Sequence, residues 1–181
     1  MKKFVFLGAI VLLAGFLTTP AYAGWNAKSD QDIENNIQET VNKFKESDTA
    51  MGRFFNKAYG YAVFPTVGKG GMGIGAAFGK GKVFEQGQII GSTSLKQISI
   101  GLQLGGQAYS EIIFFKTKTD LDNFKSGNFE LGATASAVAV TAGASADADY
   151  SDGVAIFTIP KGGLMYEASV AGQKFTFTPN Q

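Results

Sequence analysis

Three glycines near the middle of the chain match a spacing that many enzymes use to bind phosphate. Residues 68–75 read GKGGMGIG, and Gly68, Gly70 and Gly73 fit the pattern G-x-G-x-x-G of dinucleotide-binding folds. In those folds the pattern lies between a strand and a helix, so that the helix N-terminus faces the pyrophosphate. Here glycines recur at every second residue, which is the period of a strand, and no amphipathic helix follows. We therefore reject nucleotide binding.

A second group of residues that could do chemistry is a set of carboxylates. Asp147, Asp149 and Asp152 lie close together in the sequence and are followed by Gly153. Oxygen ligands at such spacings suit Ca²⁺, but the EF-hand pattern fails because Thr158 stands where a bidentate glutamate is required. The pattern favours a solvated turn between two strands over a metal site.

The inventory of side chains argues against catalysis and against nucleic-acid binding. The chain has no histidine and no cysteine, which excludes Ser-His and Cys-His nucleophile pairs and imidazole or thiolate metal ligands. Arg53 is its only arginine, and basic and acidic residues are nearly balanced at 16 and 15. A phosphate-binding domain usually has a strong basic excess. We predict a protein that is not an enzyme, uses no cofactor or metal and binds no nucleic acid.

The first residues of the chain have the pattern of an export signal. Residues 1–23 comprise two lysines, an apolar run and the small-x-small sequence Ala-Tyr-Ala, which predicts a cleaved signal peptide. Cleavage would remove Lys2 and Lys3, leaving 14 basic residues against 15 acidic ones and a net charge of −1. We expect residues 24–181 to form a single domain, exported to the periplasm, associated with the outer envelope, or secreted.

Hydrophobic periodicity divides this expected domain into two parts. Over about residues 29–58, apolar side chains recur at helical spacing, first from Ile33 to Phe44 and then from Met51 to Ala58. We expect two amphipathic helices in tandem, with Ser29 as the first N-cap, and we favour their docking on a sheet over their lying on a membrane. From about residue 60 to 178 the period is two, interrupted by a short helix capped by Thr119. The strands are expected within 71–78, 97–104, 109–116, 129–141, 154–159, 164–168 and 174–178, with a turn at residues 79–81 after the first.

These elements predict an α+β domain. The N-terminal helices would pack on a strongly curved, barrel-like and largely antiparallel sheet that is rich in glycine. Similar sequences at residues 62–76 and 155–168 suggest two hairpins with turns at residues 69–71 and 161–163. A strand faced with glycine has no side chains to bury, so either another element packs closely on it or it borders a groove for an apolar or lipid-like ligand. Close packing is the favoured alternative.

Several separated motifs resemble one known family, the SYLF domain. They are YGYAVFP (59–65), GKGGMGIG (68–75) and GKGKV (79–83), followed by a long central segment (105–133) and by AIFTIPKGGLMYEASVAG (155–172). The central segment contains SGN-x-x-LG, which is typical of the family. The resemblance implies a lipid-binding module, because eukaryotic SYLF proteins bind phosphoinositide membranes and actin. Those proteins often have an arginine near the glycine-rich turn, where this chain has Phe78 before Gly79.

On this interpretation the leading hypothesis is a protein that binds anionic phospholipid or a membrane surface in the bacterial envelope. Lysines at the expected strand turns would meet lipid phosphates, joined by cations of the second helix, while apolar side chains of the helices insert beside them. A small outer-membrane β-barrel and a structural or adhesive envelope protein remain the alternatives. The predicted lipid-binding residues are Arg53, Lys57, Lys69, Lys80, Lys82 and Lys161.

Overall fold

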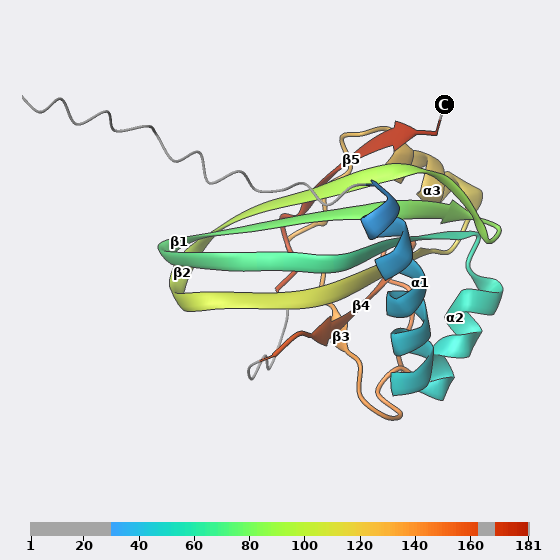
Figure 1. Cartoon of the computed structure of the whole chain (residues 1–181), viewed down its shortest axis with the longest axis horizontal. Helices are drawn as coiled ribbons and strands as arrows, with labels where there is room; N and C mark the ends of the chain where they lie inside the picture. The colour runs from blue at the N-terminus through green and yellow to red at the C-terminus, as the bar shows by residue number, and fades with distance from the viewer. Residues whose placement is uncertain (1–29, 163–168, 181) are drawn as a thin grey trace, which may run out of the picture.

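The computed structural model describes residues 30–162 and 169–180, without the side chains of residues 30–34, 72–73 and 100–105 (Figure 1). The predicted signal peptide, the expected cap at Ser29 and the expected strand at 164–168 lie outside the described residues. The described chain contains helices and a mixed sheet of five strands, which confirms the α+β class.

The N-terminal helices form as their periodicity predicts. Helix α1 spans Asp30–Ser47, a 3-10 turn spans Thr49–Met51, and helix α2 spans Gly52–Lys57. Asp48 separates the first two because its extended backbone ends α1, while its carboxylate accepts a hydrogen bond from Ala50 N at 3.0 Å. The apolar faces of the helices cover one face of the sheet, so docking is the arrangement found.

Most of the sheet is one long ribbon of two antiparallel strands. Strand β1 (Gly60–Glu85) pairs along nearly its whole length with β2 (Gln88–Phe115). The strands are joined by a two-residue turn at Gln86 and Gly87, which both have positive φ angles, of 50° and 84°. The expected turns at residues 69–71 and 79–81 are therefore wrong, since these residues continue inside β1.

This ribbon is folded back on itself near its middle (Figure 1). The first arm consists of residues 60–70 and 106–115, and the second arm of residues 76–85 and 88–98. A Cβ added at Gly81 would lie 2.2 Å from the carbonyl oxygen of Val63. Only glycine permits such an approach, so the preference for close packing is correct at this position.

Three short strands complete the sheet along β2. Strand β4 (Val154–Pro160) pairs antiparallel with the first arm of β2, and β5 (Lys174–Pro179) pairs antiparallel with the second arm. Strand β3 (Val138–Ala139) pairs parallel with β4. The order of the main path is β1-β2-β4-β3, so the sheet is not closed. The barrel-like expectation is wrong, because the direction of the ribbon changes at one bend rather than through continuous curling.

Two further predictions need correction. Helix α3 spans Lys118–Lys125 and is capped by Thr117 rather than Thr119, with a capping box between Thr117 and Asp120. In the expected strand at 129–141, only β3 and an isolated bridge at Glu130 form. The alternating alanines there offer little apolar surface to bury, so much of the segment remains a loop.

The core consists of two clusters on opposite faces of the first arm. One lies between the two arms and under α3, where Phe64, Tyr109 and Phe175 are fully or almost fully buried. The other lies under α1 and α2, where Phe54 packs edge-on against Phe157 with ring centroids 4.7 Å apart. Burial of each such aromatic side chain contributes about 1.5–3 kcal/mol. Apart from Ala77, both clusters leave the described side chains at the bent end of the ribbon outside the core.

Candidate functional site

The two-stranded ribbon, including its bent end, differs from the rest of the molecule in its charge. Residues 60–84 and 88–110 contain four lysines and not one aspartate or glutamate. The nearest carboxylates in the sequence are Glu85, at the turn between the strands, and Glu111, which is buried. We call residues 68–78 and 96–108 the ribbon end. Because charges of one sign add, this part of the molecule presents a positive field to an approaching anion. The four lysines are Lys69, Lys80, Lys82 and Lys96.

The ribbon end also exposes large apolar side chains. Ile74 is 66% exposed, Phe78 is 47% exposed and Ile98 is 77% exposed. Ile98 pairs with Ala76, so its side chain lies diagonally between those of Ile74 and Phe78 on the outer face of the second arm. Lysines continue the same face, since Lys96 pairs with Phe78. An apolar patch bordered by lysines is therefore turned toward solvent.

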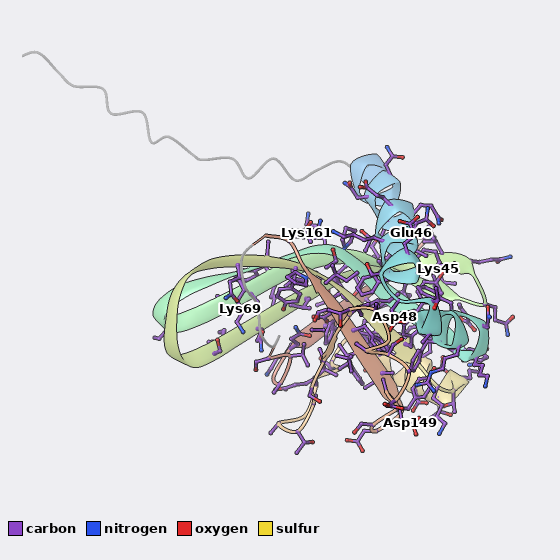
Figure 2. All side chains as sticks on the ribbon, turned by 90° about the horizontal axis from the view of Figure 1, so that it is seen from below. Lys45, Glu46, Asp48, Lys69, Asp149 and Lys161 are labelled. Carbon is purple, nitrogen blue, oxygen red and sulfur yellow. The ribbon has the colours of Figure 1, made fainter. Side chains whose placement is uncertain are left out.

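A groove of about 680 Å³ opens beside this patch, and it contains two of the predicted lysines. Its lining includes Lys69 and Lys161 together with Ala76 and Phe78 of the second arm. Lys161 follows β4; its backbone N donates to Ala108 O, and its Nζ donates to the hydroxyl of Thr66, both at 2.8 Å. Figure 2 shows Lys69 toward the bent end of the ribbon and Lys161 between Lys69 and the helices, whereas Asp149 lies on the opposite side of the molecule.

Lys69 is held in an unfavourable position for a charge. Its side chain is half-buried, and burial lowers the pKa of its ammonium group. Among the residues that the structure describes, no carboxylate forms an ion pair with it. An anionic ligand would replace the interactions with water that the ammonium group loses on burial.

The remaining predicted lipid-binding residues are divided between the two ends of the molecule. Lys80 is exposed on the outer face of the second arm, whereas Lys82 is only 5% exposed and donates to Ser92 Oγ at 3.1 Å. Arg53 donates to the carbonyl oxygens of Ser145 and Ala148, and Lys57 is exposed at the end of α2. The structure thus brings Lys69 and Lys161 together at the groove. Lys80 lies two residues beyond the ribbon end on the second arm, and Arg53 and Lys57 lie apart from all three.

The apolar helix residues that were expected to insert beside the lysines are in the core. Ile37, Val41 and Phe44 of α1 are at most 4% exposed, as are Met51 and Phe54 after it. None of the helices in the described parts of the chain is long and apolar enough to cross a membrane. The exposed apolar side chains belong to the ribbon instead, and they include Ile98 in the expected strand at 97–104.

Acidic residues form no second site in the described residues. Within these residues, no group of three or more carboxylates is arranged to hold a metal ion, and Asp147, Asp149 and Asp152 lie around the loop that leads into β4. One carboxylate, Glu111, is fully buried, and burial raises its pKa to about 8. Gln173 donates to Glu111 Oε2 at 2.9 Å, inside the core and away from the groove. Glu111 therefore belongs to the core and not to the candidate site.

The fold and this surface define the class of protein: it is an α+β domain that presents a basic and apolar ribbon end. A family model described as Ysc84, Las17-binding protein actin regulator, which is the SYLF domain, matches residues 96–180. Beta cell expansion factor A of Aeromonas veronii is 31% identical to the chain over 150 residues. That match covers 71% of this chain and 53% of the relative, so the chain spans about half the relative's length.

These matches confirm the resemblance that the sequence motifs indicate, since residues 96–180 match the model of the SYLF domain family. The family is generally non-enzymatic and is known for binding lipid or actin. The matched region begins within β2 and includes Lys96, Ile98 and Lys161.

Proposed function

We propose that the protein is a non-enzymatic, phospholipid-binding protein that attaches to membrane surfaces in the bacterial envelope. The observation that carries this proposal is the outer face of the second arm, where Ile74, Phe78 and Ile98 are exposed within a segment that has only positive charges. A large exposed apolar patch with a polar border is a feature of interaction sites. Its exclusively basic border favours an anionic partner, and a phospholipid bilayer offers both the charge and the apolar interior.

The arrangement along the strand suits the layers of a bilayer. Ile74 and Phe78 lie nearest the bend, and Lys80 follows Phe78 by two residues, which is about 7 Å along a strand. Interfacial segments bury their apolar face roughly 5–10 Å into the boundary between headgroups and acyl chains. With the bend inserted to that depth, Lys80 would lie at the level of the phosphates. Lys96 pairs with Phe78, so its backbone would lie deeper and its long side chain would extend toward the same phosphates.

The expected energies are sufficient for reversible attachment. Each lysine near an anionic leaflet contributes about 1 kcal/mol, and each fully buried large apolar side chain contributes about 1.5–3 kcal/mol. Several side chains must act together, because a contribution of about 1.4 kcal/mol changes the dissociation constant only tenfold. Attachment is therefore expected to weaken strongly with salt. Export by the predicted signal peptide would bring the ribbon end to envelope membranes.

Vesicle co-sedimentation tests this proposal. Wild-type protein is mixed with phosphatidylglycerol vesicles or with neutral phosphatidylcholine vesicles, each at low and high salt. We expect sedimentation with the anionic vesicles at low salt, a loss at high salt, and a marked loss in the variant Phe78→Ser/Ile98→Ser. The matched control is Phe55→Ser, a half-buried residue of α2 under the helices, assayed only if it remains folded. Failure of the wild-type protein to bind anionic vesicles at low salt would exclude membrane attachment and favour a protein partner.

A further inference from the structure

The glycines of the ribbon are of two kinds, and one kind has no packing role. A Cβ added at Gly79 would meet Val67 Cγ2 at 3.0 Å, so this glycine allows the two arms to approach. At Gly68 an added Cβ would meet nothing within 4 Å, and at Gly106 it would reach only Lys69 O, at 4.0 Å. Gly68 and Gly106 both line the groove. The groove is therefore open because side chains are missing there.

The groove has the size and lining of a site for one small ligand. Its volume of about 680 Å³ falls within the range of roughly 300–1,000 Å³ that is typical of ligand sites. One part of the lining is cationic, through Lys69 and Lys161, and another is apolar, through Ala76 and Phe78. Among the described residues, no carboxylate lines the groove. A ligand that complements this lining has an anionic group next to an apolar one.

The position of the two lysines is specific rather than a consequence of general surface charge. Lys161 comes from the end of β4, about 90 residues along the chain from Lys69, and its Nζ is directed to Thr66 on the same strand as Lys69. Lys69 is half-buried without an ion pair among the described residues, and its ammonium would gain most from a bound anion. Phe78 belongs both to the groove and to the exposed patch, so the groove opens onto the face that we place on the membrane.

We propose that this groove binds a single anionic phospholipid molecule, with its phosphate at Lys69 and Lys161 and its nearest acyl segment against Ala76 and Phe78. This inference rests on the proposed function and adds a defined site with a stoichiometry of one. Attachment through the patch requires only a charged surface, whereas occupation of the groove requires the phosphate and the acyl chain in one molecule.

Isothermal titration calorimetry of the full chain with a short-chain phosphatidylglycerol, kept below its critical micelle concentration, tests the inference without a membrane. We expect one lipid bound per chain. Gly68→Val and Gly106→Val should each weaken binding at least tenfold by filling the groove, and Lys69→Met should weaken it to a similar extent. Lys116→Met removes an exposed lysine that follows the other end of β2 and should leave the affinity unchanged. Thermal melts followed by circular dichroism verify that each variant is folded.

The same titration with glycerol phosphate and with inorganic phosphate separates a lipid site from a simple anion site. Binding of either that equals the binding of the lipid would overturn the inference. Binding of the wild-type protein to anionic vesicles without binding of monomeric lipid would also overturn it, while leaving membrane attachment intact. Monomeric lipid that binds equally well to folded Gly68→Val and Gly106→Val would show that it binds elsewhere. Conversely, saturable binding of monomeric lipid without vesicle binding would support the groove and contradict membrane attachment.

Discussion

The two ends of the β1–β2 ribbon have the same backbone pairing but opposite surfaces. At the helix-covered end, large side chains fill both faces of the first arm, and Phe114 packs against Phe55 with ring centroids 4.9 Å apart. At the ribbon end, glycines replace large residues on the strands, and the large apolar residues that remain, such as Ile98, are exposed. The helix-covered end therefore stabilises the fold, and the ribbon end is available for binding.

Charge follows the same division. The helix-covered end has carboxylates within hydrogen-bonding reach of their partners, such as Asp48, which accepts from Ser145 N and Ser145 Oγ, both at 2.7 Å. These hydrogen bonds lower the pKa of Asp48, the bond from the Ser145 hydroxyl most of all. The ribbon end has lysines without carboxylates. The two ends should therefore respond differently to substitution, to pH and to anionic membranes.

Truncation of an aromatic side chain should lower the free energy of unfolding strongly at the helix-covered end and hardly at all at the ribbon end. Phe114→Ala removes a fully buried ring under the helices and should lower the free energy of unfolding by about 3–5 kcal/mol. Phe78→Ala removes a half-exposed ring at the ribbon end and should change it by about 0.5 kcal/mol. Urea unfolding followed by circular dichroism measures both. Equal losses would mean that the ribbon end belongs to the core.

Raising the pH should destabilise the protein through the helix-covered end. The pKa of Glu111 is about 8 in the folded protein and 4.5 in the reference state. Between these values the folded protein retains a proton that the unfolded chain has released, so the free energy of unfolding falls as pH rises and levels off above about pH 8. From pH 5 to 8 the loss should be on the order of 2–4 kcal/mol. Urea unfolding of wild type and Glu111→Gln at several pH values measures it.

Glu111→Gln should remove most of this slope, because the amide has nearly the same shape and does not titrate in this range. Titration of Asp48 does not interfere, since its lowered pKa confines its effect to more acidic solutions. A variant that retained the full wild-type slope would show that another group is responsible. The pH effect distinguishes the two ends, because the described side chains of the ribbon end include no carboxylate.

The two kinds of glycine should respond differently to the same substitution. Gly81→Ala places a Cβ 2.2 Å from Val63 O, so the arms must separate and the free energy of unfolding should fall by about 1–3 kcal/mol. Gly68→Ala meets no atom within 4 Å and should be neutral or stabilising by about 0.5 kcal/mol. Thermal unfolding of the matched pair measures the difference. A comparable loss in both would contradict an open groove at Gly68.

Single lysines should matter for membrane binding only at the ribbon end. Lys96→Ala should weaken binding to phosphatidylglycerol vesicles by about 1 kcal/mol, which is roughly fivefold. Lys57→Ala, on α2, should have no measurable effect, although the sequence had suggested Lys57 as a lipid contact. Vesicle titrations at low salt compare the two variants. A larger loss of binding in Lys57→Ala than in Lys96→Ala would indicate that the helix-covered end contacts the membrane.

Much of the architecture could be predicted from the sequence where side chains determine the local structure. Apolar spacing predicts α1 and α2, and alternation predicts β4 and β5 within about a residue. The bend could not be predicted, because glycines at a period of two are compatible with a straight strand, a close contact or a groove. Only the tertiary structure shows that Gly81 contacts the other arm and that Gly68 faces open space.

The candidate site was predicted in part. Lys69, Lys80 and Lys161 could be named because they lie next to glycines, but the same reasoning included Lys82, which is buried. Ile98 could not be recognised, since a strand with one exposed face and a strand covered on both faces can contain the same alternating residues. The absence of carboxylates from residues 60–84 and 88–110 was visible in the sequence and would have located the site.

The most direct test of the account is the environment of one label at each end of the molecule. Because the chain has no cysteine, Ile98→Cys and Asn56→Cys can each receive a single polarity-sensitive fluorophore. On addition of phosphatidylglycerol vesicles at low salt, the label at position 98 should shift to the blue and become protected from an aqueous quencher. The label at position 56, on α2, should remain unchanged. A shift at position 56 alone, or at neither position, would contradict membrane attachment through the ribbon end.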